Sequence, residues 1–388
     1  MNYVPHLVVT KTREWAAKAV RPAKHFSPRK KPSQCPNYSP LYGGLDIRAN
    51  KSIKEYAMKN LKTLMAATAV LLTSLPVFAQ DLVKIGTFVP EKSVGVAHVI
   101  KPWMEAVNTQ TDSVQMKGFW GGTLGKSPFK QFELVQNGVM DVSWVLPAYT
   151  AGQFPEMGVF ELPFLFRTAE EASVVGWKLH EQGLLTGFDG VHVIGFFAAE
   201  PNALFMKTKA KDLSALKNMK IRAVGGIHAS WLESLGAASE TLSSAEMNEA
   251  LNRGTLDGAV QGWTGMRTFK SLALVDQAHA VPAGAIPFLL LMNQSKWDSL
   301  SSGAQEKIME HGGLSMAKMG GGAYTAVGEE IRAGVIDEGR IEIVEYSGEQ
   351  IDQWGEAAKS VHKAWIDATP NGQVVYDAAV AALTEMRK

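Results

Sequence analysis

The sequence predicts an α/β fold, because strand-like and helix-like segments alternate along most of its 388 residues. Apolar residues recur with a period of two in some segments, as in strands, and with a period of 3.6 in others, as in helices. Segments of the two kinds take turns, which favours a mostly parallel sheet. The alternation begins near residue 80, and the remaining chain of about 309 residues commonly divides into two lobes at that size.

Strands and helices are predicted in two sets. In the first, helices are expected at Val96–Val107, Pro128–Gln136 and Ala169–Gln182, and strands at Leu82–Val89, Val114–Trp120, Asp141–Leu146 and Val191–Ala198. In the second, helices are expected at Ala229–Leu235 and Ala245–Arg253, and strands at Lys220–Val224, Ala238–Leu242 and Leu256–Gln261. Ser243 and Glu246 have the spacing of a capping box, and Gly254 is expected to end the helix that they begin.

Long helices are predicted from Ser301 onward. Ser302 with Gln305 can cap the first of them, and Ser347 with Gln350 a later one. The run Gly320–Gly322 lies within a helical stretch, although each glycine costs about 1 kcal/mol relative to alanine. This run predicts a bend or close packing, or else a break between two helices.

Residues 58–79 have the pattern of a secretory signal. A basic start at Lys59 and Lys62 precedes an uncharged run from Leu64 to Leu75, and the segment Val77–Ala79 has the residues of a cleavage site. The apolar run is shorter than the roughly 20 residues that cross a bilayer. We therefore expect an exported protein that is cleaved after Ala79.

Residues 1–57 differ in composition from the rest of the chain. They hold 11 Lys or Arg and 3 Asp or Glu, and they show no sustained period. We expect an upstream extension that is unstructured or not native; the alternative is a basic tail with a purpose of its own. The only cysteine, Cys35, lies in this extension, so the exported part has no disulfide, thiolate metal site or cysteine nucleophile.

The exported part is acidic and lacks the common catalytic motifs. Residues 80–388 contain 26 Lys or Arg and 35 Asp or Glu, a formal charge of −9, which argues against a nucleic-acid footprint or a polybasic membrane patch. The segment Gly121–Ser127 is similar to a phosphate-binding loop, but Trp120 stands where that motif requires its first glycine. There is no serine-hydrolase elbow, zinc-protease helix or dinucleotide fingerprint. His98 and His228 alone lie near the start of a helix after a strand, where open sheets place ligands.

The most specific part of the chain is the run from Phe119 to Phe166. It contains the segments GGTLG at 121–125, ELVQNGVMD at 133–141 and FPEMGVFELPFLF at 154–166. Further segments follow in order at Asp212–Leu213, Lys220–Arg222, Leu235–Ala237, Ala250–Leu251 and Leu256–Gly258. This ordered set resembles the solute-binding proteins of TRAP transporters, and the resemblance covers nearly all of residues 82–388.

The resemblance implies a periplasmic receptor with a two-lobed, periplasmic-binding-protein-like fold. A ligand cleft would lie between the lobes, with long helices crossing both. Residues 80–199 and 287–325 would form lobe I, and residues 200–286 and 326–388 lobe II. The implied partners are a small organic acid and a membrane permease driven by an ion gradient, with no nucleic acid, cofactor, metal site or catalytic residue.

The family's central ligand contact is an arginine near the end of a strand in the second lobe, and Arg222 holds that place. A guanidinium suits the task because its planar fork of donors can hold a carboxylate by two parallel hydrogen bonds. The residues alone would assign Arg222 to the surface. The resemblance implies that it binds the ligand.

Two positions depart from the family pattern. Many sialic-acid and dicarboxylate receptors of the family have a second arginine upstream. This chain has Glu200, Pro201 and Asn202 there, so a second anionic group on a ligand would find fewer positive partners. If Glu200 faces the cleft, it would favour a zwitterionic or amine-bearing ligand. An aromatic residue common in the family aligns near Ser244, so one apolar wall of the pocket is missing or replaced.

Three further residues are ligand candidates at or near the ends of later strands. The polar residue that commonly follows the Asp-Gly turn in this family aligns with Gln261, after Asp257-Gly258, and its amide can both donate to and accept from a ligand oxygen. Trp263 and Trp144 either present a flat face to the ligand or pack between the lobes.

Aromatic residues also end the first two predicted strands. Phe88, Phe119 and Trp120 point toward the sheet edge at which open α/β sheets collect ligands. The alternative is ordinary hinge and core packing.

These observations favour a receptor whose lobes close around a small carboxylate that pairs with Arg222. One rival is a receptor of the same class for a neutral, zwitterionic or amine-bearing solute. The other is a secreted enzyme, for which no nucleophile, base and orienting group occur in recognisable spacing.

Overall fold

The computed structural model describes residues 80–150 and 152–388. They belong to one compact unit, Val77–Lys388. The predicted extension at 1–57, the predicted signal at 58–79 and the expected cleavage after Ala79 lie outside the described residues.

The first sheet has five strands. They span Asp81–Gly86 (β1), Val114–Phe119 (β2), Val142–Val145 (β3), Val191–Ala198 (β4) and Pro287–Asn293 (β10), in the order β2-β1-β3-β10-β4. β1 pairs in parallel with β2 and β3, whereas β10 is antiparallel to both β3 and β4. The four strands expected in the first set are confirmed, and β10 is a strand that the sequence did not predict.

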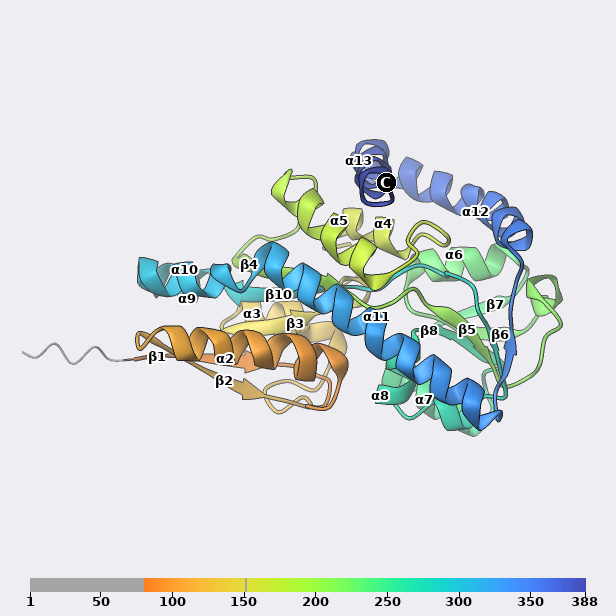
Figure 1. Cartoon of the computed structure of the whole chain (residues 1–388), viewed down its shortest axis with the longest axis horizontal. Coiled ribbons are helices and arrows are strands. Elements are labelled where there is room, and N and C mark those ends of the chain that lie inside the picture. The colour runs from red at the N-terminus through yellow and green to blue at the C-terminus, as the bar shows by residue number, and fades with distance from the viewer. Residues whose placement is uncertain (1–79, 151) are drawn as a thin grey trace, which may run out of the picture. The chain divides into compact units, whose positions relative to one another are not determined.

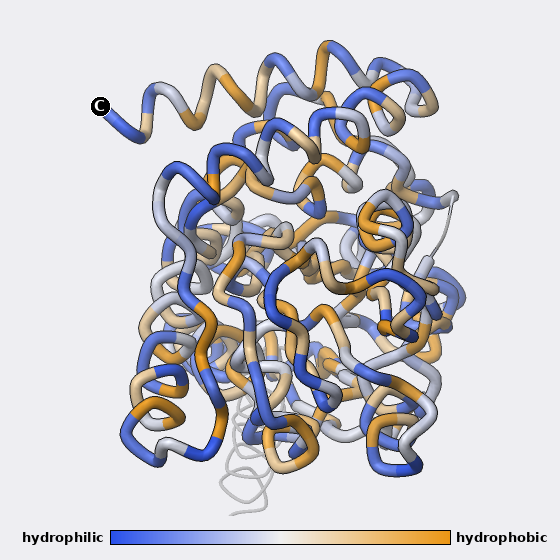
Figure 2. The backbone as a smooth tube through the Cα atoms, turned by 90° about the vertical axis from the view of Figure 1, so that its right-hand side faces the viewer, coloured by the Kyte–Doolittle hydropathy of each residue, from blue (hydrophilic) through white to orange (hydrophobic). Residues whose placement is uncertain are grey.

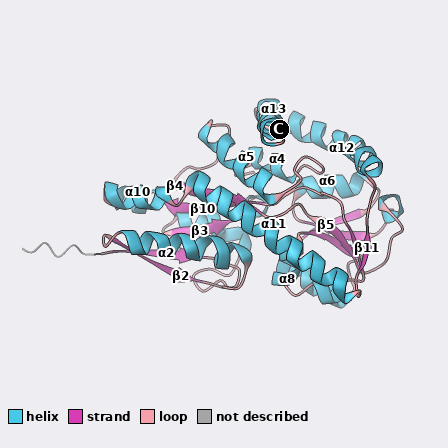
Figure 3. Cartoon of the chain, in the orientation of Figure 1, coloured by secondary structure: helices cyan, strands magenta, loops and turns pink. Residues whose placement is uncertain are grey.

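The second sheet has six strands. They span Ala203–Met206 (β5), Lys220–Ala223 (β6), Ala238–Thr241 (β7), Gly258–Gln261 (β8), Gln277–His279 (β9) and Glu342–Val344 (β11), in the order β11-β9-β5-β8-β6-β7. β6 is parallel to β7 and β8, as expected, whereas β5 is antiparallel to β8 and β9. Figure 3 shows the two groups of strands with helices around them.

Helices connect and cover the strands. Before β9 they span Lys101–Gln110 (α2), Gln131–Gln136 (α3), Gly158–Glu161 (α4), Ala169–Glu181 (α5), Gly226–Ser234 (α6), Ser244–Arg253 (α7) and Trp263–Thr268 (α8). A π-helical stretch, Gly95–Ile100 (η1), leads into α2, and a 3-10 turn, Pro147–Tyr149 (η3), follows β3. Toward the C-terminus they span Gln294–Ser299 (α9), Ser302–Glu310 (α10), Gly313–Glu338 (α11), Gly348–Ala368 (α12) and Gly372–Met386 (α13).

The helix-capping predictions are confirmed for two helices and shifted in a third. Both α7 and α12 begin with complete capping boxes, and α7 ends at Gly254 with φ of 74°. At α10 the cap is Ser301, whose hydroxyl accepts a bond from Ala304 N, instead of the expected Ser302. Along α13, hydrophilic and hydrophobic residues alternate as on a surface helix (Figure 2).

Helix α11 is continuous, so the run Gly320–Gly322 marks close packing and not a break. A Cβ on Gly320 would come within 2.5 Å of Phe197 Cβ, and one on Gly321 within 2.5 Å of the backbone at Glu170. The missing side chains let α11 lie directly against β4 and α5. The helix then continues past α8, so it packs on elements of both sheets (Figure 1).

Two extended segments join the sheets beside each other, one between β4 and β5 and one between β9 and β10. Their backbones pair: Ala199 N donates to Ile286 O (2.9 Å), Asn202 N to Gly284 O (2.8 Å) and Ala283 N to Asn202 O (2.9 Å). We call the sheet that contains β1 with its helices the first lobe, and the sheet that contains β6 the second lobe. The paired segments have the position of a hinge between them.

The lobe limits expected from the sequence stay a prediction. All strands of the first sheet lie within residues 80–199 and 287–325, and all strands of the second within 200–286 and 326–388. Of the last two helices, α12 packs on α6, whereas α13 packs on α5 and α4.

Candidate functional site

A cavity lies between the two sheets. Its wall includes residues at or just beyond the ends of four strands: Phe88 after β1, Leu146 after β3, Val224 after β6 and Gln261 at the end of β8. About 70 Å³ is open to the centre of a water-sized sphere, which is several times the space that one water needs. Ligands of open α/β sheets bind at such strand ends.

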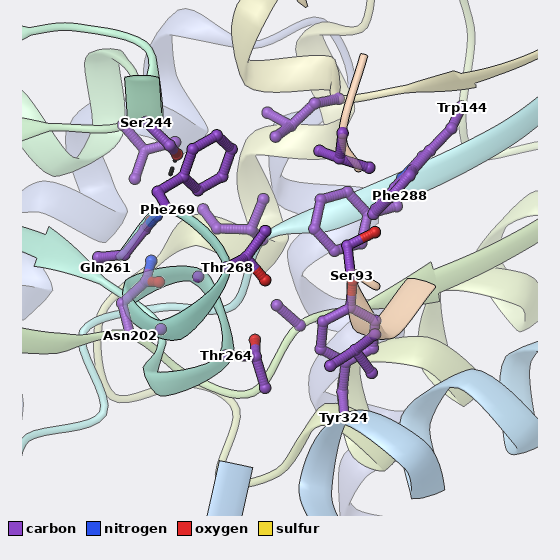
Figure 4. Close-up of a pocket in the computed structure, with 18 of the residues that line it drawn as sticks. Ser93, Trp144, Asn202, Ser244, Gln261, Thr264, Thr268, Phe269, Phe288 and Tyr324 are labelled. Carbon is purple, nitrogen blue, oxygen red and sulfur yellow. Dashed lines mark hydrogen bonds between the residues drawn. The ribbon is translucent and has the colours of Figure 1, made fainter. Parts of the chain in front are cut away.

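The wall is aromatic on one part and polar on another (Figure 4). Six aromatic side chains line it, namely Phe88, Trp144, Tyr149, Phe269, Phe288 and Tyr324. Its hydroxyl and amide groups belong to Ser93, Asn202, Ser244, Gln261, Thr264 and Thr268. None of the described lining residues carries a charge, so a charge for ligand recognition has to come from behind the wall.

Arg222 supplies a positive charge behind one end of the cavity. It lies on β6, is 0% exposed and does not itself line the wall. Nε donates to Leu242 O (2.9 Å), Nη1 to Val260 O (2.8 Å) and to the Gln261 side chain (3.2 Å), and Nη2 to Tyr149 Oη (3.2 Å). A guanidinium has five N–H groups, so one N–H on Nη2 has no partner among the described residues.

Tyr149 connects this arginine to the opposite lobe. Its hydroxyl oxygen also accepts a bond from Ser244 N (2.9 Å) and lies 3.3 Å from Ser244 Oγ. Gln261 Nε2 in turn donates to Ser244 Oγ (3.0 Å), the bond marked in Figure 4. We call Tyr149, Arg222, Ser244 and Gln261 the polar end of the cavity.

The charge of Arg222 is not balanced by a nearby acid. No carboxylate within residues 80–150 and 152–388 forms an ion pair with it, and Glu161 and Glu246 act on it only at longer range. Burial lowers the pKa of Arg222, because a guanidinium that is removed from water loses its hydration. An anion at the polar end would offset that loss.

A buried histidine fixes the amide of Asn202 beside the polar end. Nε2 of His228 lies 2.8 Å from Ala283 O, and Nδ1 lies 3.1 Å from a carboxylate oxygen of Glu161. Nδ2 of Asn202 lies 3.2 Å from Nε2 of His228, and Oδ1 of Asn202 has no partner among the described residues. The amide oxygen of Asn202 is therefore a buried acceptor without a partner, in a residue that lines the cavity.

Glu200 is buried outside the cavity wall, where it caps the start of α8. Its carboxylate accepts bonds from Thr264 N (2.8 Å) and Thr264 Oγ1 (3.0 Å), which caps the first turn of that helix. Burial raises the pKa of Glu200 to about 7, against the opposing effect of these bonds. The condition for an amine-bearing ligand, that Glu200 face the cleft, is therefore not met in this structure.

Five of the ten predicted site residues line the cavity: Phe88, Trp144, Asn202, Ser244 and Gln261. Arg222 lies directly behind the wall, in contact with Gln261. Trp263 packs edge to face on Phe205, with ring centroids 4.7 Å apart, and lies with Glu200 in a separate hollow beside α11.

The remaining two predicted site residues, Phe119 and Trp120, are half-buried at the end of β2, outside the cavity. Of the two histidines singled out, His228 is buried beside the site and His98 is exposed.

Several lining residues were not predicted, and Tyr149 is the most important of them. It follows β3 through η3 and so lies at the same strand-end edge that singled out Phe88. The rule that ligands of open α/β sheets bind at strand ends could therefore have singled out Tyr149 as well. Phe288 lies on β10 and Tyr324 on α11. The sequence did not predict that the chain returns to the first sheet at β10, so it gave no reason to place these two residues at this edge.

Residues 85–368 match the family model described as bacterial extracellular solute-binding protein, family 7. The chain belongs to this family. The predicted resemblance to the solute-binding proteins of TRAP transporters and the two-lobed fold are thereby confirmed, and the family and its structural relatives are receptors for extracytoplasmic solutes.

No described helix is both long and apolar enough to cross a membrane, and in the same residues no cluster of His, Cys, Asp or Glu could hold a metal ion.

Three relatives illustrate the likeness. The outer membrane transporter protein TsaT of Comamonas testosteroni is 24% identical over 260 residues, or 65% of this chain and 77% of the relative. A marine metagenome TRAP solute-binding protein specific for aromatic acids, solved with 3-hydroxybenzoate, is 27% identical with a TM-score of 0.75, covering 80% of this chain and 99% of that one. A Bordetella bronchiseptica TRAP solute-binding protein, solved with (R)- and (S)-mandelate, is 25% identical with a TM-score of 0.70, covering 79% and 99%.

Proposed function

We propose that this receptor captures a small aromatic monocarboxylate in the cavity between its lobes and delivers it to a TRAP membrane permease. The observation that carries the proposal is Arg222, a fully buried guanidinium that forms no ion pair with the described carboxylates. An isolated buried charge is costly, and a carboxylate at the polar end offsets that cost.

The polar end offers several donors to one carboxylate. Nη2 of Arg222 has an N–H to spare, and the Tyr149 and Ser244 hydroxyls can turn their protons toward an anion. Charge-assisted bonds of this kind are stronger than neutral ones.

The rest of the cavity suits an aromatic ring. Trp144 packs edge to face on Phe288, with ring centroids 4.9 Å apart, and Phe88 and Tyr324 continue the apolar surface. Flat apolar walls favour a flat apolar body, which gains by leaving water. The two relatives solved with 3-hydroxybenzoate and mandelate bind aromatic acids, which supports the same ligand class here.

Export and delivery complete the proposed role. We propose that the receptor works in the periplasm after cleavage at Ala79, and that hinge closure on the ligand presents a surface to the permease. N-terminal sequencing of the exported protein tests the first point, with Gln80 as the expected first residue. A first residue well upstream would contradict cleavage at that site.

Thermal denaturation with matched ligands tests the proposed ligand class. Benzoate, benzamide and benzylamine share a ring and differ in charge, so the panel separates recognition of an anion from recognition of a neutral or amine-bearing solute. Benzoate at a thousand times its dissociation constant is expected to raise the free energy of unfolding by about 4 kcal/mol, with no shift for the other two. A larger shift with benzamide or benzylamine would overturn the proposal in favour of that rival ligand class.

A further inference from the structure

Two buried polar atoms on the first-lobe side of the cavity have no hydrogen-bond partner among the described residues. They are Oγ of Ser93 and Nε1 of Trp144, and both residues line the cavity. Ser93 is 3% exposed and Trp144 2%. Buried polar atoms without partners are rare because each carries a desolvation cost, so a group inside the cavity is expected to bond to this pair.

The two residues belong to one local structure, away from the polar end. Ser93 lies just before η1, and the backbone at Gly95 in η1 approaches Trp144 so closely that a Cβ there would come within 2.6 Å of the indole ring. Phe88, Phe197 and Phe288 surround the indole and offer its N–H no oxygen. Figure 4 shows Ser93 and Trp144 on the opposite side of the cavity from Ser244 and Gln261.

The chemistry of the pair restricts what it can bind. An indole N–H only donates, and a serine hydroxyl can donate or accept, so the matching ligand group must accept a hydrogen bond. A second carboxylate is excluded because the described wall holds no charged side chain on this side, and burying an unpaired anion is costly. A neutral oxygen, as in a ring hydroxyl, fits both conditions.

We propose that Ser93 and Trp144 form a second recognition point for a neutral hydroxyl on the ring of the ligand, at the end of the cavity away from its carboxylate. The inference rests on the proposed function and narrows it to hydroxylated aromatic monocarboxylates. Ser93 and Trp144 then determine specificity among ring acids, while the polar end provides affinity for all of them.

Calorimetric titration with benzoate, the three hydroxybenzoate isomers and isophthalate tests this inference. The best hydroxybenzoate isomer is expected to bind roughly three- to tenfold more tightly than benzoate, the size of one net hydrogen bond, and isophthalate to bind far more weakly than either. In Ser93→Ala or Trp144→Phe the hydroxyl advantage should fall to within about twofold. Ser244→Ala, at the polar end, is the control, since it should weaken benzoate and hydroxybenzoate alike and leave their ratio unchanged.

The outcomes separate the inference from the proposed function. If benzoate binds as tightly as every hydroxybenzoate isomer, or if the hydroxyl advantage persists in both Ser93→Ala and Trp144→Phe, the second recognition point is wrong while the receptor for aromatic acids stands. Isophthalate binding as tightly as the best hydroxybenzoate would overturn the requirement for a neutral group. Failure of all the ring acids to bind would overturn the proposed function itself.

Discussion

The two ends of the cavity solve different problems. At the polar end, Arg222, Tyr149, Ser244 and Gln261 bond to one another, so their positions are set by the protein. At the aromatic end, side chains are held by ring packing, and the polar atoms of Ser93 and Trp144 have no described partner. In the arrangement of the lobes seen here, the protein itself positions the groups proposed to recognise the carboxylate, and it leaves the side-chain polar atoms proposed to recognise a ring hydroxyl without partners.

The polar end is formed by contacts between the two lobes, whereas most of the aromatic end belongs to one lobe. Tyr149 belongs to the first lobe, and its hydroxyl bonds to Arg222 and Ser244 of the second. Trp144, Phe88 and Phe288 all come from the first lobe. Under the proposed function, the ring of a ligand would contact the wall of the first lobe before the lobes close, and its carboxylate would complete its contacts afterwards.

Replacing Trp144 with alanine should have the largest effect, on the free energy of unfolding. The indole is fully surrounded at the aromatic end, so its removal leaves a cavity and should cost about 3–5 kcal/mol. Chemical denaturation measures this. Trp263→Ala is the matched control, because Trp263 is also buried but lies outside the cavity wall; it should destabilise similarly and leave benzoate affinity unchanged. If folded Trp263→Ala loses affinity for benzoate, Trp263 takes part in ligand binding after all.

Replacing Arg222 with lysine should break the polar end alone. Lysine keeps the charge but not the planar fork, so benzoate binding should lose about 2–5 kcal/mol. Arg267→Lys, an exposed arginine of the same lobe, is the control and should change affinity little. Calorimetry measures both variants. Unchanged affinity in Arg222→Lys would end the carboxylate role of the arginine.

Glu200 is a buried acid beside the cavity that belongs to neither the polar end nor the aromatic end. Its pKa of about 7 lies above the unfolded value of 4.5, so the folded state holds the proton more tightly. The stabilisation from Glu200 is complete below about pH 4.5 and is lost as the pH rises through about 7, by at most about 3 kcal/mol. Other groups titrate in the same range, so the difference in unfolding free energy between the wild type and Glu200→Gln is the quantity to follow. A difference that stays constant between pH 4.5 and 7.5 would show that the carboxyl is not held protonated.

The sequence predicted the strand-end edge better than the side chains that meet there. Apolar alternation located β6 and β8, on which the family resemblance identified Arg222 and Gln261, but fully buried apolar strands such as β5 and β10 carry no signal of their direction. Of the two alternatives left open for Trp263, the structure has the packed one, with the side chain on Phe205 and outside the cavity wall. α8 begins at that residue, so the alternation of β8 no longer decides where its side chain points.

The burial of Arg222 could not have been read from the sequence either. One of the partners that hold it is Tyr149, which lies 73 residues away along the chain and reaches across from the other lobe. No local pattern links the two residues. The family resemblance identified Arg222 as a candidate, and the structure shows that the Tyr149 hydroxyl bonds to it.

Tyr149→Phe should have the smallest effect of these changes, and it tests whether the polar end is one network. Phenylalanine keeps the ring and removes the oxygen that accepts from Arg222 and Ser244, so two buried donors lose a partner. Benzoate binding should weaken by about 1–3 kcal/mol, while the affinity ratio between hydroxybenzoate and benzoate stays the same. Tyr376→Phe is the control, because its hydroxyl bonds to His362 on α12, outside the cavity wall. If Tyr149→Phe changes the ratio and leaves benzoate affinity intact, the two ends are not separate recognition points.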